Sequence, residues 1–188
     1  TLVPEAVEPD IRHALVISEK NIEAICAQDP EAATYESTFL AYEKSCEDLG
    51  RGWGRLNHLD SVSDSAAQRE ALGKMLPDVT NFYSSLALND RLWAVIKTVG
   101  ESAEIASLSP VQKRFVEETL EDFRNSGADL PPAQKKRIAA IEAELSKITK
   151  DYSEHVLDST NAWELFITDE AKLDGLPESA KAGAAANA

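Results

Sequence analysis

Apolar side chains recur along most of this chain in steps of three and four residues, a spacing that places them on one face of an α-helix. The longest stripe follows Pro131 and Pro132, which fit a first helical turn because a missing N–H costs nothing there. It predicts a helix of about 25–30 residues with a continuous apolar seam. The seam consists of Ile138, Ile141, Leu145, Ile148 and Tyr152, and is extended by His155 and Val156.

A short strand is predicted after this helix, at about 163–167. The sequence Trp163-Glu164-Leu165-Phe166-Ile167 is rich in the aromatic and branched side chains that strands favour, and Asp174-Gly175 with Pro177 indicates a turn beyond it. A lone strand leaves its backbone groups unpaired. The pattern therefore implies either a second strand that the sequence does not reveal or a partner outside these residues.

The rest of the chain predicts shorter helices with recognisable ends. Together they indicate a mainly α protein, a single domain over 1–188 built as a bundle of long antiparallel helices joined by short turns. Thr1 to Asp10, broken by prolines, is expected to be extended. The helices are expected from Pro9 to Gln28, from a cap at Thr34 through Leu56, from a cap at Ser63 or Asp64 through Leu86, from Asn89 or Asp90 to Gly100, from Ser109-Pro110 to Asn125, and from Glu178 onward.

The group Gly50-Arg51-Gly52-Trp53-Gly54 lies within one of these predicted helices. Its glycines disfavour a helix, but the helical spacing of apolar residues continues through the group. A phosphate-binding loop would need a preceding strand and a following Lys-Ser/Thr, and neither is present. The sequence instead favours a long helix that is locally weakened or kinked by its three glycines.

Charge and composition restrict the classes of partner. The 188 residues are 43% apolar, which indicates a globular protein. Their net charge of −14 argues against a nucleic-acid partner, since a phosphate backbone requires a basic face. The basic turn Lys135-Lys136-Arg137 is interpreted as a solvated helix end. The sequence contains no signal peptide and no apolar run of about 18 residues, so neither a membrane partner nor export is expected.

The two cysteines, Cys26 and Cys46, are predicted to be buried reduced thiols. If their helices pair through the turn at Asp29-Pro30, the two thiols differ in height by about 15 Å, which is too far for a disulfide. This favours a cytoplasmic protein.

Catalytic chemistry is not evident from the residues, and we predict no catalytic, cofactor-binding or metal-binding residue. His13, His58 and His155 belong to no zinc pattern. Asp151 and Asp158 can share a helix face with His155, and such a face could orient a base or bind a metal weakly. The favoured interpretation is that His155 lies at the edge of the seam and is paired with a neighbouring carboxylate. The carboxylates of the helix after Ser109 are expected to form a solvated face; they are Glu117, Glu118, Glu121 and Asp122.

An ordered succession of short motifs nevertheless resembles a known family. The motifs are Pro4-Glu5, Trp53-x-x-Leu56-x-His58-Leu59-x-Ser61-Val62, Ser109-Pro110-x-Gln112, Asp122-Phe123-x-x-Ser126-Gly127-x-x-Leu130-Pro131, Tyr152-Ser153-Glu154-His155-Val156-Leu157-Asp158, and Asp169-Glu170-x-x-Leu173-x-Gly175-Leu176-Pro177-Glu178-Ser179. In order and spacing they resemble the N-terminal half of the thimet oligopeptidase family of zinc metallopeptidases, in its oligopeptidase A and peptidyl-dipeptidase branch.

The resemblance implies that residues 1–188 are the N-terminal part of a larger peptidase chain, cut at both ends. In that family a His-Glu-x-x-His helix and a further Glu hold the zinc, all downstream of the region matched here. This chain would then form a wall of a substrate channel that admits short peptides, would partner the missing catalytic part, and would be inactive alone. The alternatives are a free-standing helical module that binds a peptide or protein, for instance through the strand at 163–167, and an unrelated acidic regulatory bundle.

Overall fold

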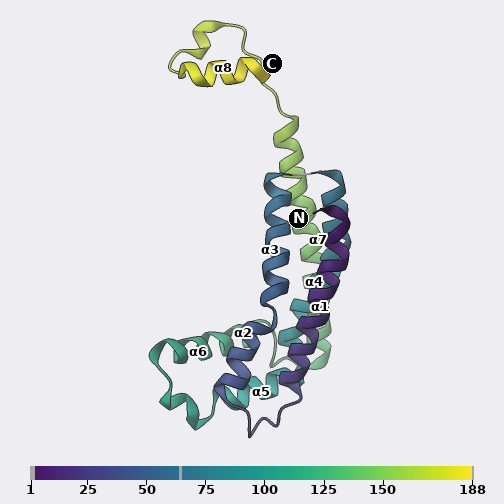
Figure 1. Cartoon of the computed structure of the whole chain (residues 1–188), viewed down its shortest axis with the longest axis vertical. Coiled ribbons are helices and arrows are strands. Elements are labelled where there is room, and N and C mark those ends of the chain that lie inside the picture. Colours follow the sequence, from purple (N-terminus) through teal and green to yellow (C-terminus); the bar gives the residue numbers. More distant parts are fainter. Residues whose placement is uncertain (1–2, 64, 188) are drawn as a thin grey trace. The chain divides into compact units, whose positions relative to one another are not determined.

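The computed structural model describes residues 3–63 and 65–187, and it divides the chain into a first unit that ends at Lys150 and a second unit that begins at Asp151. Every regular element in these residues is helical, which confirms the mainly α fold class (Figure 1). In chain order the elements are α1 (Pro4–Cys26), the π-helical turn η1 (Glu36–Leu40), α2 (Ala41–Ser45), α3 (Glu47–Val62), α4 (Ala66–Leu88), α5 (Asp90–Gly100), the 3₁₀ turn η2 (Ala103–Ser107), α6 (Pro110–Asn125), α7 (Pro132–Ala162), the 3₁₀ turn η3 (Glu170–Leu173) and α8 (Glu178–Asn187).

Successive long helices of the first unit run in alternating directions, as the sequence predicts. Asn21 of α1 contacts Ser45 at the end of α2, whereas Ile11 lies opposite Gly52 in α3, so α1 and the α2–α3 segment are antiparallel. Glu8 pairs with Lys74 and Arg12 pairs with Asp78, so the contacts advance in the same direction along both helices and α4 is parallel to α1. α5 and α6 pack at one end of these helices (Figure 1). The core between them is apolar; its fully buried members include Phe39, Leu49, Met75, Leu92 and Ile96.

The opening of the chain is helical rather than extended, so that prediction is wrong for the residues that are described; Thr1 and Leu2 lie outside them. α1 begins at Pro4, in the first helical turn, where proline sacrifices no hydrogen bond. Pro9 lies inside the helix. Val7 is 4% exposed and extends the buried face of α1 by one turn before Ile11, which offsets the hydrogen bond that Pro9 cannot make.

The helix that carries the glycine group is broken, but not at the glycines. Gly50, Gly52 and Gly54 all lie within α3, and the break falls at Cys46, whose φ is −113° and ψ 11°. The Ser45 hydroxyl donates to the Tyr42 carbonyl at 2.6 Å, and the Asn21 amide donates to the Ser45 carbonyl at 3.2 Å. These side-chain bonds occupy carbonyls that would otherwise continue the helix, so the interruption arises one turn before the glycines.

Side-chain caps define the starts of three helices of the first unit, α4, α5 and α6. Asn89 caps α5 and Ser109 forms a capping box with Gln112 at the start of α6, both as predicted. Thr34 accepts from the Ser37 amide at 3.2 Å and so opens the η1–α2 segment. The cap of α4 is Ser65 rather than Ser63, because the Ser65 hydroxyl accepts from the Gln68 amide; Asp64 lies outside the described residues.

The long predicted helix is present as α7, but its apolar seam is not buried. In the first unit Ile138 packs over Gly127, and further along the helix the seam becomes exposed. Ile141 is 38% exposed, Leu145 51% and Ile148 55%. The contacts that hold this part of α7 are mostly polar: the Ser146 hydroxyl bonds to Thr80 of α4 at 2.7 Å, and Lys135 reaches the α4–α5 corner.

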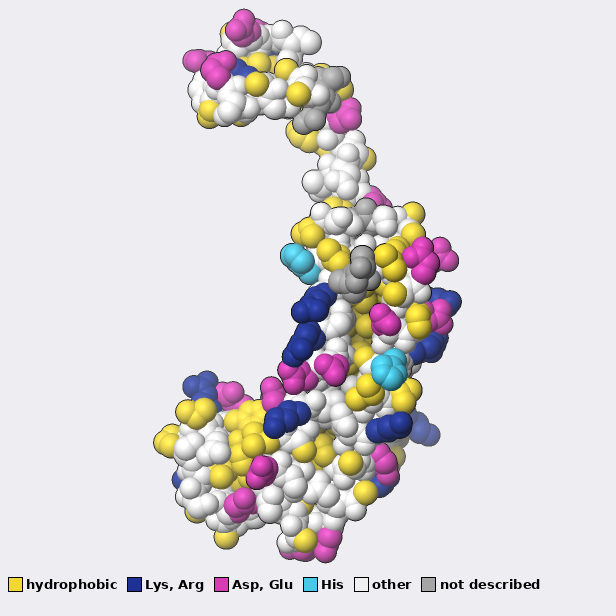
Figure 2. All heavy atoms as spheres, viewed as in Figure 1, with side chains coloured by type: hydrophobic (Ala, Val, Ile, Leu, Met, Phe, Trp, Pro, Cys, Tyr) yellow, Lys and Arg dark blue, Asp and Glu magenta, His cyan; other side chains and the backbone are white. Residues whose placement is uncertain are grey.

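The predicted strand at 163–167 is not seen in the second unit. Residues 163–169 have no regular structure, and Trp163 (69%), Leu165 (64%) and Phe166 (68%) are strongly exposed. Strand preference alone does not form a strand when no partner strand is at hand, and none exists among the described residues. Between 151 and 186 no residue is buried, and Figure 2 shows apolar side chains on the surface of this unit.

Candidate functional site

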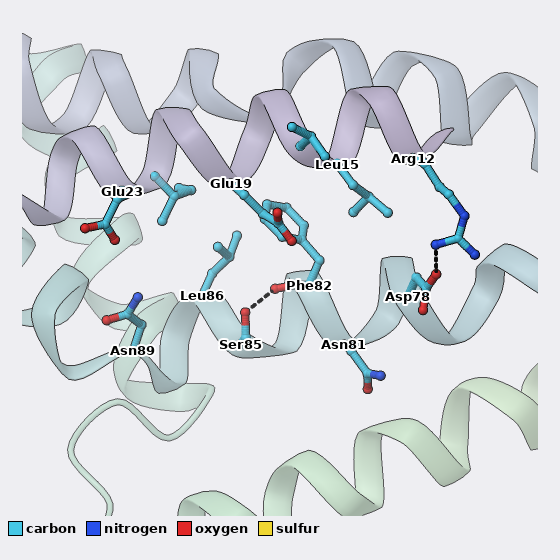
Figure 3. A pocket seen from close by; sticks show the side chains of 12 residues that line it. Arg12, Leu15, Glu19, Glu23, Asp78, Asn81, Phe82, Ser85, Leu86 and Asn89 are labelled. Carbon is cyan, nitrogen blue, oxygen red and sulfur yellow. Dashed lines mark hydrogen bonds and ion pairs between the residues drawn. The ribbon is translucent and has the colours of Figure 1, made fainter. Parts of the chain in front are cut away.

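A groove of about 620 Å³ between α1 and α4 is the candidate binding site of the first unit (Figure 3). Its floor is apolar because α1 and α4 each turn core positions toward it at helical spacing. The floor residues are Leu15 and Ile22 of α1 and Phe82 and Leu86 of α4, each less than a tenth exposed. The groove is therefore built on the outer layer of the core, and its shape is fixed by the packing of these two helices.

Two ion pairs close the rim of the groove. Arg12 donates to Asp78 at 2.9 Å, as Figure 3 shows, and the Arg91 guanidinium contacts both oxygens of Glu23 at 3.1 and 2.8 Å. Hydrogen bonds to carboxylates raise the pKa of Arg12, through Glu8, and of Arg91, through Glu23. All these groups are exposed to solvent, so the pairs position the rim side chains and contribute little to stability.

The rest of the rim combines the carboxylate of Glu19 and the apolar Val16 with neutral polar groups. Asn81 of α4 also lines the groove, although its side chain points away from α1 in Figure 3, and the Ser85 hydroxyl donates to the Phe82 carbonyl at 2.7 Å. Asn89 closes one end, where it caps α5 and its amide approaches Cys26 Sγ at 3.7 Å. The apolar floor can bind a short apolar segment, and the amides and carboxylates of the rim can bind its polar flanks. The lining contains neither histidine nor cysteine.

A second cavity, of about 250 Å³, is lined by aromatic rings from three helices. Tyr42 of α2 packs edge-on against Phe123 of α6, with ring centroids 5.4 Å apart, and Tyr83 of α4 contributes to the wall. Burial raises the pKa of Tyr42 to about 12, with smaller contributions from Cys46 and Asp122. Each ring belongs to a predicted apolar stripe, but the sequence gives no signal that the three stripes meet.

The histidine considered for base or metal chemistry lies on the surface of the second unit. His155 is exposed there, and Asp151 and Asp158, which can share its helix face, both have interaction partners. The favoured interpretation, a histidine at the edge of the seam paired with a carboxylate, stays a prediction. Across 3–63 and 65–187, no three His, Cys, Asp or Glu side chains come together in a way that could hold a metal ion.

The charged segments singled out in the sequence differ in outcome. The four α6 carboxylates are exposed, as predicted, and Glu118 pairs with Arg114. Lys135 is not a solvated end residue: it is buried, and its ammonium group contacts Asp90 and the Leu88 carbonyl. The ammonium group of Lys135 is thus bound by the carbonyl at the end of α4 and the carboxylate at the start of α5. The spacing of residues in the sequence could not reveal these contacts.

The cysteines are free, which agrees with the prediction that they do not form a disulfide. Cys26 is buried, whereas Cys46 is only half-buried at the break between α2 and α3. Burial raises the pKa of both thiols, which disfavours the thiolate. Among the residues described, none of the helices is long and apolar enough to cross a membrane.

Comparison with known proteins identifies the family. A model of the N-terminal domain of neurolysin and thimet oligopeptidase matches residues 10–136, well over half of the chain. The chain belongs to the neurolysin/thimet oligopeptidase family. The resemblance inferred from the sequence motifs is thereby confirmed.

The relatives of this family member are longer proteins. Oligopeptidase A of Escherichia coli K12 is 34% identical over 187 residues, which cover 100% of this chain and 27% of the relative. Two Arabidopsis thaliana proteins, a probable cytosolic oligopeptidase A and an organellar (chloroplastic/mitochondrial) oligopeptidase A, are each 31% identical over 174 residues. Dipeptidyl carboxypeptidase of Escherichia coli K12 is 24% identical over 155 residues, or 82% of this chain. The chain spans about a quarter of the length of the curated relatives it matches.

Proposed function

We propose that this chain is the N-terminal, helical part of a zinc metallo-oligopeptidase that hydrolyses short peptides. The observation that carries the proposal is the match to a family model that is itself an N-terminal domain, in a chain that spans about a quarter of its relatives. In this role the chain forms a wall of the substrate channel and controls access to it. The peptide-bond chemistry belongs to the remaining polypeptide.

The geometry of the first unit supports a binding and gating role. The groove between α1 and α4 offers apolar surface, amides and carboxylates on a packed scaffold, which suits contact with a short peptide. Its lining provides no nucleophile activated by a base. A rigid helical wall with such a groove can select what passes along it without reacting with it.

Zinc does not fit the residues that the structure describes. The described residues bring no three metal-ligating side chains together, whereas a catalytic zinc needs three protein ligands and an open position. We therefore assign zinc to the remaining polypeptide and derive no step through it here. The proposed partners are short peptides and that catalytic polypeptide, with no nucleic acid and no membrane; the proposed location is the cytoplasm, the compartment named for one of the two plant relatives.

Two peptidase assays test this assignment. The purified 188-residue chain, supplied with zinc, is expected to leave fluorogenic short peptides intact. A chimera in which this chain replaces the aligned quarter of E. coli oligopeptidase A is expected to cleave those peptides and to lose cleavage when zinc is chelated. Zinc-dependent cleavage by the isolated chain, or a folded chimera without activity, would refute the proposal.

The alternative function, a free-standing helical module that binds a protein or peptide, is favoured by one observation. The segment Trp163–Ile167 is exposed and carries four large apolar side chains, a composition typical of binding surfaces. A module of this kind would bind its partner in the absence of any catalytic polypeptide. If the chimera is active and these side chains become buried from solvent in it, the result favours the peptidase assignment over the module.

A further inference from the structure

The apolar face of α7 in the first unit lacks a partner in the described structure. It is formed by Ile141, Leu145 and Ile148, which are exposed by 38%, 51% and 55%. These residues are spaced by four and three positions, so they lie on one side of the helix. A regular apolar stripe on one helix face is the pattern of a packing surface, and scattered exposed aliphatic residues do not produce it.

Ile138, one turn before this face, packs over Gly127. The contacts of α7 with α4 and with the α4–α5 corner lie on a different side of the helix. Lys135 contacts Asp90, Ser146 bonds to Thr80, and the Lys150 side chain passes over Gly73. At about 100° per residue these three positions fall within about 60° of one another, and the apolar face is centred about 140° away from them. α7 is thus fixed to α4 by polar groups, while its apolar face is left free for another element.

We propose that this face, Ile141, Leu145 and Ile148, is a docking surface for the polypeptide that the relatives carry beyond the matched quarter. The proposal rests on the proposed function and adds to it the surface by which the helical part is joined to the catalytic part. The occupant is an apolar face of that polypeptide, linked to this chain covalently.

The length of the relatives supports this occupant. This chain corresponds to 27% of E. coli oligopeptidase A, so about three times as much polypeptide is available in the relative to cover exposed surface. The second unit, considered separately, supports the same conclusion: it has no buried residue between 151 and 186, and Trp163, Leu165 and Phe166 are each exposed by more than half. A segment without a core of its own requires an external one.

The small size of the face argues against a second copy of this chain. A stable interface between separate proteins buries about 800 Å² on each partner. Even an aromatic side chain presents only about 150–250 Å², so three half-exposed aliphatic ones offer well under half of the required area. A covalently linked segment needs less area, because the linkage raises its effective concentration to about the millimolar range.

The test compares two matched pairs of substitutions on α7. The variant Leu145→Glu/Ile148→Glu places two charges on the docking surface. The control Ala140→Glu/Ala143→Glu places the same two charges on exposed positions at another side of the helix. Each variant is made in the isolated chain and in the chimera with E. coli oligopeptidase A, and amide hydrogen exchange is measured for residues 141–150.

In the unmodified proteins, exchange at 141–150 is expected to be at least about tenfold slower in the chimera than in the isolated chain, since burial of one aliphatic side chain shifts an equilibrium by about that factor. Leu145→Glu/Ile148→Glu should restore the faster rate in the chimera, and the control pair should not. Equal exchange in chimera and isolated chain, or equal effects of the two pairs, would overturn the proposal.

Two further measurements decide the remaining outcomes. Sedimentation of the isolated chain is expected to show a monomer; a dimer that Leu145→Glu/Ile148→Glu dissociates and the control pair does not would identify a second copy as the occupant and overturn the proposal. If the chimera does not fold, the same glutamate pairs are placed at the aligned positions of intact E. coli oligopeptidase A. There the docking pair should lower the unfolding temperature more than the control pair; equal effects would contradict the proposal. If exchange at 141–150 is slowed in the chimera but the chimera has no peptidase activity, the proposed function is refuted and the docking surface is not.

Discussion

Two glycines of the first unit predict opposite responses to the same substitution. Gly100 ends α5, and a Cβ added there would lie 2.8 Å from Leu120 Cδ1, 3.1 Å from Cδ2 and 3.2 Å from Cγ. Leu120 of α6 is only 7% exposed and has little room to move. Gly54 lies inside α3, and a Cβ there would meet no atom within 4 Å. Gly100→Ala and Gly54→Ala therefore separate packing from helix preference.

The magnitudes follow from these environments. Gly54→Ala is expected to stabilise the chain by about 0.5–1 kcal/mol, because alanine loses less backbone entropy than glycine in a helix. Gly100→Ala gains less than this at a helix end and incurs an overpacking cost of about 1–3 kcal/mol. We expect a net destabilisation of about 1–2 kcal/mol, which corresponds to a decrease in Tm of roughly 2–8 °C for a protein of this size.

Urea and thermal unfolding followed by circular dichroism at 222 nm measure both effects. The double variant Gly100→Ala/Leu120→Ala provides the control, because truncating Leu120 removes the clash. Leu120→Ala alone should cost about 2–5 kcal/mol, and it should cost about 1–2 kcal/mol less in the Gly100→Ala background. The reasoning is refuted if Gly100→Ala is as stable as the unmodified chain, or if the two substitutions at 100 and 120 are additive.

Three further predictions concern titration, capping and a buried charge. Because burial raises the pKa of Tyr42 to about 12, the unfolded state loses this proton first; stability should be complete below about pH 10 and fall by up to roughly 2–3 kcal/mol as the pH approaches 12, and unfolding of Tyr42→Phe should lack this loss. Asn89→Ala removes the acceptor for the Arg91 and Leu92 amides and should cost about 1 kcal/mol in urea unfolding; no loss would contradict the capping role. Asp90→Asn deprives the buried ammonium group of Lys135 of its carboxylate and should cost about 1–3 kcal/mol, a loss that should be smaller in a Lys135→Met background.

Local signals in the sequence predict the helices and several of their ends. The cap at Asn89 and the capping box at Ser109 depend on residues within one turn, so their geometry follows directly from composition. The break at Cys46 could not be predicted in the same way. It depends on the Ser45 hydroxyl and on Asn21, which is 24 residues away in the sequence and approaches only when α1 packs against α2.

Burial and site geometry depend on contacts that the sequence pattern does not contain. The spacing of Ile141, Leu145 and Ile148 predicts an apolar face, but not whether an element covers it. Strand preference at Trp163–Ile167 likewise indicates side chains that suit a sheet, while a strand forms only beside a partner. The groove between α1 and α4 was not predicted, because it requires the parallel placement of two helices that are separated by α2 and α3.

The most direct test of the central claim is to determine the gene sequence downstream of the codon for Ala188. The account predicts an open reading frame that continues for about three times the present length and encodes a His-Glu-x-x-His helix, in keeping with relatives of which this chain spans about a quarter. A stop codon directly after Ala188 would contradict the claim that this chain is the front part of a metallopeptidase.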